Sequence, residues 1–134
     1  AITHTETQVT WPTAANTVSV TSGSNATSET ITIDATCFQA SIICKADNAG
    51  TPASGDYIEI WALPSAGDPD GSSTDEHPST TQGWYLGLLD TNGDDPATRF
   101  FQLPVPAVSY EFYVLSNAAS NSITFSCSIL EQRG

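Results

Sequence analysis

The feature that most constrains the fold is an alternation of apolar and polar residues near the C-terminus. Ile123, Phe125 and Cys127 fall on one side of an extended chain, with threonine and serine residues between them. Because side chains on a strand change face at every residue, this pattern predicts a strand with one buried and one wetter side. A similar run precedes it, and small polar residues at 117–121 separate the two, so residues 109–131 are predicted to form a hairpin.

An isolated hairpin is only marginally stable in water, and the rest of the chain supplies further strands. The run 37–46 is apolar at almost every position, which predicts a central strand covered on both faces. No segment predicts a helix. About eight antiparallel strands predict one all-β domain, a jelly-roll-like β-sandwich, with an immunoglobulin-like sandwich as the second choice. The remaining predicted strands lie within residues 17–21, 29–34, 56–63, 84–89 and 98–103.

Residues 1–16 lack a sustained alternation, and Trp11-Pro12 is their only bulky feature. We interpret them as an extended N-terminal arm that precedes a sandwich domain at 17–134. The arm either lies across a neighbouring molecule, with Trp11 as an anchor, or packs on its own domain.

The charge of the chain excludes two classes of partner. Fifteen acidic residues stand against three basic ones, for a formal net charge of −12. Such a surface repels phosphate backbones and anionic lipid head groups, so we expect neither nucleic acid nor membrane as a partner. The three cysteines are an odd number, and Cys37 and Cys44 would face opposite ways on one strand. Buried reduced thiols are therefore expected, which fits assembly in a reducing cytoplasm.

Acidic residues gather in two loops and form the strongest candidate for metal binding. One loop holds Asp68 and Asp70, and the other holds Asp90, Asn92 and Asp94. Calcium takes six to eight oxygen ligands, and clustered carboxylates on loops provide them. Asp and Asn are also ordinary turn residues. We expect no cofactor, with calcium as the alternative.

No motif of a known catalytic centre occurs in the chain. The sequence has no nucleophile elbow, no zinc-type histidine pair and no phosphate-cradling glycine loop. Glu59 and Glu111 are the only mid-strand acids that could act together in glycoside hydrolysis, and each fits a solvated strand face equally well. The chain is therefore predicted not to be an enzyme.

Aromatic residues offer a second kind of binding site. Trp61 and Trp84, joined by tyrosines at 57, 85 and 113, could form a stacking platform for sugar rings. The same residues could instead fill a sandwich core or a subunit interface.

Four turn motifs stand out between residue 67 and residue 124. They are GDPDG at 67–71, LGLLDTN at 86–92, DPA at 95–97 and YVLSNAASNSIT at 113–124. In these motifs the chain is similar to the small acidic all-β virion proteins of tailed bacteriophages, some of which are head decoration, or cement, proteins.

The resemblance implies a jelly-roll-like subunit, commonly a homotrimer, that binds the major capsid protein. It implies a location on the outer capsid surface of the virion, after assembly in the host cytoplasm, and a role in capsid stabilisation. Trp11 and Pro12 are then expected to contribute to the capsid contact, and the loop 64–83 to lie at one end of the sandwich. The alternative function is a carbohydrate-binding module or a tail or fibre receptor-binding domain that uses the aromatic face.

Overall fold

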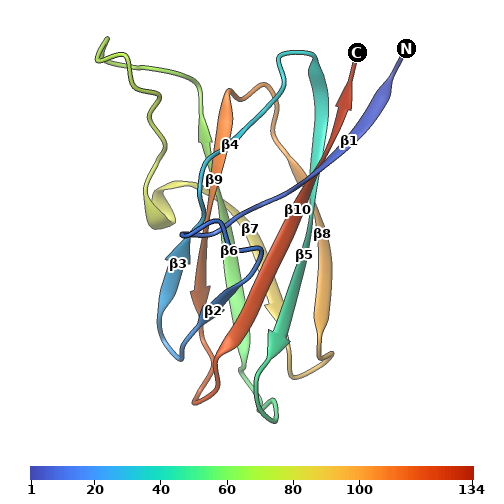
Figure 1. Ribbon diagram of the computed structural model, residues 1–134. Helices are drawn as coiled ribbons and strands as arrows, with labels where there is room; N and C mark the ends of the chain where they lie inside the picture. Colours follow the sequence, from blue (N-terminus) through green and yellow to red (C-terminus); the bar gives the residue numbers. More distant parts are fainter.

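The computed structural model describes residues 1–134, and strands in two packed layers make up most of it (Figure 1). One five-stranded antiparallel sheet, the β5 sheet, has the order β1-β10-β5-β8, with β2 also paired to β10. The other, the β6 sheet, has the order β3-β9-β6-β7, with β4 also paired to β9. The prediction of an all-β, jelly-roll-like sandwich is confirmed. The elements are β1 (Thr3–Gln8), β2 (Val18–Val20), β3 (Asn25–Thr27), β4 (Ile31–Thr32), β5 (Cys37–Asn48), β6 (Tyr57–Ser65), the 3-10 turn η1 (Thr80–Gln82), β7 (Trp84–Asp90), β8 (Ala97–Leu103), β9 (Ser109–Ser116) and β10 (Ile123–Arg133).

Each of the eight predicted segments contains a strand, and β1 and β3 add two more. The predicted C-terminal hairpin is wrong, however, because β9 and β10 belong to different sheets. β9 pairs with β6 along its length, and β10 pairs with β5 from Ile123 to Arg133. Residues 117–122 therefore cross from one layer to the other. Alternation within a strand identifies its buried face, but it does not identify the neighbouring strand.

The core lies between the two sheets and consists of the inward-facing residues of both. Trp11 meets Phe125 edge to face at 5.8 Å between ring centroids, and Tyr110 stacks on Phe112 at 5.7 Å. All four rings are nearly inaccessible to water. Burying a side chain of this size contributes roughly 2–3 kcal/mol of folding free energy, so these rings are a major part of the stability.

The N-terminal segment is part of the sandwich and is not a separate arm. β1 pairs with β10 from Thr3 to Gln8, and the backbone N–H of Val9 donates to the carbonyl of Cys127 at 3.0 Å. Trp11 follows with 1% of its surface exposed. Of the two arrangements expected for residues 1–16, the structure has the one in which they pack on their own domain.

The long loop at 66–83 begins at one end of the sandwich and returns along the outer face of the β6 sheet (Figure 1). The Nε2 atom of His77 lies 2.9 Å from the Ser109 hydroxyl on β9, and its Nδ1 atom lies 3.8 Å from the Glu111 carboxylate. Gly83 packs so tightly on Leu63 that a Cβ atom there would come within 2.4 Å of it. The loop thus covers part of one outer face, and no such segment covers the other.

The structure contains no helix of the length and apolar character that crossing a membrane requires.

Candidate binding surfaces

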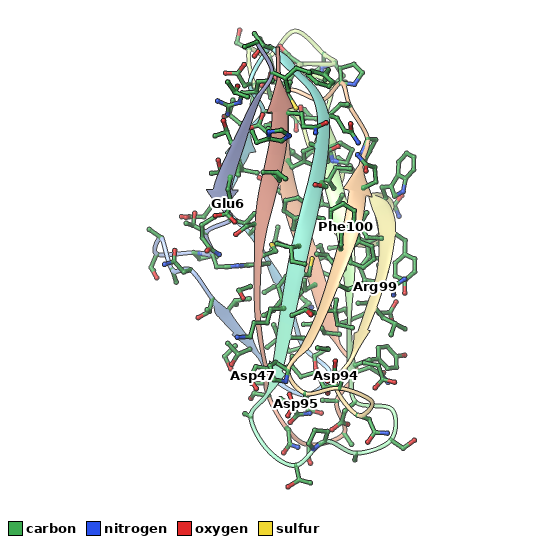
Figure 2. The ribbon with its side chains drawn as sticks, turned by 90° about the vertical axis from the view of Figure 1, so that its right-hand side faces the viewer. Glu6, Asp47, Asp94, Asp95, Arg99 and Phe100 are labelled. Carbon is green, nitrogen blue, oxygen red and sulfur yellow. The ribbon has the colours of Figure 1, made fainter.

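The outer face of the β5 sheet is an open surface with an apolar centre (Figure 2). Ile43 on β5 is directly opposite Phe100 on β8, and Leu130 lies on the neighbouring strand β10. Their exposed fractions are 47%, 60% and 40%. The strand 37–46 was predicted to be covered on both faces, and this is wrong for its outer face. Pairing with two neighbours covers the edges of β5, whereas its outer face has no third layer above it.

A shallow hollow of about 140 Å³ lies within this apolar centre. The three exposed apolar side chains line this hollow together with two serines and Glu6. Serine, threonine and glutamine occupy most of the surrounding outward positions on β10, β5 and β8. An apolar centre inside a polar rim is the usual composition of a protein–protein contact. The lining residues are Glu6, Ser41, Ile43, Phe100, Ser128, Ile129 and Leu130.

The same face carries little net charge on a strongly acidic protein. Asp94 and Asp95, in the turn before β8, lie beside Asp47 at one end of this face (Figure 2). By register and exposure the charged residues on its strands are Glu6 on β1 and Lys45 and Asp47 on β5. These are two of the fifteen acidic residues and the only lysine of the chain. By contrast, seven acidic residues lie between 56 and 90, on β6, β7 and the adjoining loops. The apolar centre of the β5 sheet, whose lining holds one charged residue, Glu6, is therefore less strongly charged than the acidic loops of the β6 side.

The opposite outer face, on the β6 sheet, holds the predicted aromatic cluster. The Trp61 ring lies 4.9 Å from Tyr85 and 5.6 Å from Tyr113 between centroids. Trp61 is only 9% exposed and Tyr113 is also buried, so Tyr85 is the ring of this cluster most open to solvent. Burial and the neighbouring Glu59 carboxylate raise the pKa of Tyr85. Trp61 therefore acts chiefly as packing under Tyr85.

Trp84 does not join this cluster, although it is 58% exposed. It borders a hollow of about 210 Å³ at the loop end of the sandwich, beside Pro64, Pro104 and Pro106. A larger apolar hollow of about 330 Å³ adjoins it through Ala66, Pro106 and Ala107. The two predicted stacking residues therefore belong to different surfaces, and the exposed one lies over a proline-lined end.

The two acidic loops do not form one site. β6 and β7 are antiparallel, so the loop after β6, with Asp68 and Asp70, and the turn after β7, with Asn92 and Asp94, lie at opposite ends. No group of three or more His, Cys, Asp or Glu side chains is arranged to hold a metal ion. The prediction of a joint site is wrong. Calcium binding at either loop alone stays a prediction.

Both loops use their carboxylates to close their own turns. Asp68 accepts backbone N–H bonds from Asp70, Ser72 and Ser73 at 2.6–3.2 Å. Asp90 accepts the N–H of Asn92 at 2.9 Å. This is the ordinary turn chemistry of Asp.

Glu59 and Glu111, the two mid-strand acids, also lie apart. Across β6 and β9, Glu59 is opposite Leu115 and Leu63 is opposite Glu111, so the two acids are four residues apart along the sheet. Glu111 accepts a hydrogen bond from the Thr30 hydroxyl at 2.9 Å. The two carboxylates do not flank a common cleft.

Sequence reasoning missed a buried polar cluster at the end opposite the long loop. Asp56, 1% exposed, accepts the backbone N–H groups of Ala119 and Ala53, each at 3.0 Å, and the side-chain amide of Asn48 at 3.2 Å. These bonds lower the pKa of Asp56, the Ala119 bond contributing most. The Thr91 hydroxyl joins through Asn48 at 3.2 Å. The cluster holds three connections together and is a structural site.

Comparison with known proteins finds similarity of fold only. No protein-family model matches the chain, and no curated protein matches its sequence. The structure of the infectious bursal disease virus Gx strain aligns with all of this chain at 12% identity and a TM-score of 0.54. The VP2 subviral particle of the same virus aligns with 98% of the chain at 15% identity and a TM-score of 0.52.

A third similar structure is the Clostridium thermocellum xylanase 10B, with CBM22-1 and GH10 modules, in complex with xylohexaose. It aligns with 98% of this chain at 10% identity and a TM-score of 0.52. The alignments span 32% of each of the two viral chains and 25% of the xylanase chain. At these identities the comparisons establish a β-sandwich that occurs both in virus particles and in a modular carbohydrate-active protein.

Proposed function

We propose that this protein is a non-enzymatic structural component of a bacteriophage virion that binds the major capsid protein lattice and stabilises the outer surface of the capsid. The observation that carries the proposal is the outer face of the β5 sheet, where Ile43, Phe100 and Leu130 form an exposed apolar centre whose lining holds one charged residue, Glu6. The turn motifs at 67–71 and 113–124 supply the resemblance to head decoration proteins.

The size of the apolar centre favours a weak contact that is repeated many times. Burying apolar surface contributes about 25 cal/mol per Å², so three partly exposed side chains give a modest affinity at one site. A capsid presents many identical sites by symmetry, and linked copies bind with a much higher effective affinity than one copy. A homotrimer, which is part of the proposal, would present three such faces together.

The distribution of charge also fits an outer position. Most of the nine acidic residues between 56 and 95 lie on the β6 side of the sandwich or at its ends, and Asp94 and Asp95 border one end of the open face (Figure 2). With the β5 sheet against the shell, this acidic side faces solvent and repels DNA. The proposal moves the capsid contact from Trp11 and Pro12 to the β5 sheet, because Trp11 is part of the core.

The first experiment is the copy number of the protein in purified particles, measured by quantitative mass spectrometry against the major capsid protein. We expect copies comparable with those of the capsid protein. A handful of copies per particle would instead assign the protein to the tail or a fibre, and absence from particles would overturn the proposal.

A second experiment tests the surface itself. Capsid shells of the encoding virus, prepared without this protein, are incubated with purified wild type, Phe100→Ser or Trp84→Ser. Both variants remove an exposed aromatic ring, one from the β5 sheet and the other from the loop end. We expect Phe100→Ser to lose binding to the shells and Trp84→Ser to keep it. The reverse result would place the contact at the loop end.

The second candidate function is carbohydrate or receptor binding, and the observation in its favour is Trp84. An exposed indole over a hollow lined by prolines offers a flat apolar surface of the kind on which sugar rings stack. A glycan array probed with wild type and Trp84→Ala tests it. Binding that Trp84→Ala abolishes supports this function. Trp61→Ala is a poorer probe because Trp61 is buried and its loss alters packing.

A further inference from the structure

Two of the three cysteines face each other across the central strand pair of the β5 sheet. Cys44 on β5 is the direct cross-strand partner of Cys127 on β10. Both side chains point into the core, both are almost fully buried, and both are reduced in the structure. The pairing brings together residues that are far apart in the sequence.

The backbone hydrogen bonds show which kind of cross-strand pair this is. The carbonyl of Cys127 accepts the N–H of Val9, at 3.0 Å, and the Gln8 side-chain amide, also at 3.0 Å. The backbone groups of Cys127 therefore point toward β1, away from β5. Opposite Cys44, Cys127 stands in a non-hydrogen-bonded pair, where Cα atoms are about 4.5 Å apart and side chains are closest. A disulfide requires its two Cα atoms to lie roughly 4.4–6.8 Å apart. The Cα spacing of a non-hydrogen-bonded pair falls within this range.

We propose that Cys44 and Cys127 form a covalent modification site, at which oxidation joins β5 to β10 through a cross-strand disulfide. The oxidant is a small disulfide such as oxidised glutathione. One cysteine thiolate attacks a glutathione sulfur, forms a mixed disulfide and releases one reduced glutathione. The second cysteine thiolate then attacks the sulfur of the first cysteine and releases the second glutathione. The protein loses two thiol protons and two electrons, and one glutathione disulfide becomes two thiols.

The surroundings of the pair slow its oxidation in the folded protein. Burial first, and then the neighbouring Cys44 thiol, raise the pKa of Cys127 well above its ordinary value. Thiolate is therefore scarce in the folded protein, and the reaction needs access during folding or during a transient opening of β10. Cys37 cannot form the disulfide with Cys127 in place of Cys44, because the cross-strand partner of Cys37 is Arg133, six residues beyond Cys127.

The test is refolding of the full chain in a buffer of reduced and oxidised glutathione, with fully reducing refolding as the reference. Folded protein is quenched in acid, unfolded and alkylated, and its mass is measured. The chain has three cysteines. We expect one alkyl group per oxidised chain, on Cys37, and a linked peptide pair that contains Cys44 and Cys127. Three alkyl groups on folded chains, or a bridge to Cys37, would overturn the proposal.

Variants assign the bridge without depending on a difficult substitution. Cys37→Ser alters a partly exposed residue outside the pair, and we expect its oxidised form to take up no alkyl group. Cys127→Ala should keep two alkylatable thiols and form no internal bridge. The alkylation counts of the wild type and of Cys37→Ser are sufficient to identify the Cys44–Cys127 bridge. The assignment therefore does not depend on whether Cys127→Ala folds. Circular dichroism confirms that the alkylated fractions came from folded protein.

Discussion

The carboxylate of Asp56 accepts the backbone N–H of Ala119 at 3.0 Å, across 63 residues of sequence. It also accepts the N–H of Ala53, so one side chain ties the β5–β6 connection to the segment that crosses between the sheets. The pKa of Asp56 is lowered by these bonds from its ordinary value of 3.8.

A lowered pKa makes the stability depend on pH in a defined direction. The unfolded Asp56 carboxyl binds its proton near pH 3.8, and the folded one binds it only at lower pH. The contribution of Asp56 to stability is therefore present above pH 3.8 and is lost as the pH falls through the folded pKa. We expect the melting temperature to fall steeply below about pH 4. The Asp56→Asn variant should have a lower melting temperature than wild type at pH 7 and a smaller fall in melting temperature below about pH 4. An equally large fall in the variant would contradict the assignment of this pH dependence to Asp56.

Trp11 packs against Phe125 in the core, so its truncation should destabilise the protein. Replacing a buried aromatic ring by alanine costs about 3–5 kcal/mol. We expect Trp11→Ala to lower the free energy of unfolding by this amount in a urea titration, and Trp11→Phe to lose much less. Deletion of residues 1–12 should likewise reduce stability, because it removes β1 from β10. A loss below about 0.5 kcal/mol for Trp11→Ala would mean that residue 11 packs on another molecule.

The sequence predicted the strands better than their partners. Alternation placed Phe125 and Cys127 on a buried face because period-two burial is a local property of one strand. The partner of each strand depends on contacts across many residues, so the small polar residues at 117–121 indicated a hairpin where the chain changes sheets. For the same reason the pairing of Cys44 with Cys127 had no local signal.

The candidate surfaces were harder still to predict. Ile43 lies in a nearly continuous apolar run, and such a run is typical of a strand covered on both faces. Ile43 is exposed because no third layer packs on the outer face of the β5 sheet, and this depends on the tertiary structure. A signal was nevertheless present, since serine, threonine and glutamine recur at alternate positions of β10 and β8 on the same face.

Chelation tests the remaining metal prediction. The Asp68 carboxylate already accepts three backbone N–H groups, and the second acidic turn lies at the other end of the molecule. A ligand that binds only the folded state raises the melting temperature, so removal of a bound calcium ion would lower it. We expect the same melting temperature with EDTA and with about 1 mM calcium, a concentration on the order of 1,000 times a micromolar dissociation constant. A calcium-dependent rise would show that one loop binds the ion alone.

The adjacent residues Phe100 and Phe101 separate surface function from stability. They lie on opposite faces of β8, with 60% of Phe100 and 8% of Phe101 exposed. Truncation of the buried ring removes core contacts and leaves a cavity, so Phe101→Ala should cost about 3–5 kcal/mol. Phe100 contributes one cross-strand contact with Ile43, and such pairs are worth roughly 0.2–1 kcal/mol.

We therefore expect Phe100→Ala to lower the free energy of unfolding by less than about 1 kcal/mol in urea titrations while it abolishes binding to capsid shells. A small loss of stability together with a loss of shell binding would show that the apolar surface of Phe100 serves to bind a partner, because folding does not require it. Equal destabilisation by the two variants would show that the outer face of the β5 sheet is covered within the folded protein. A stable Phe100→Ala that still binds shells at full occupancy would remove this face from the capsid contact.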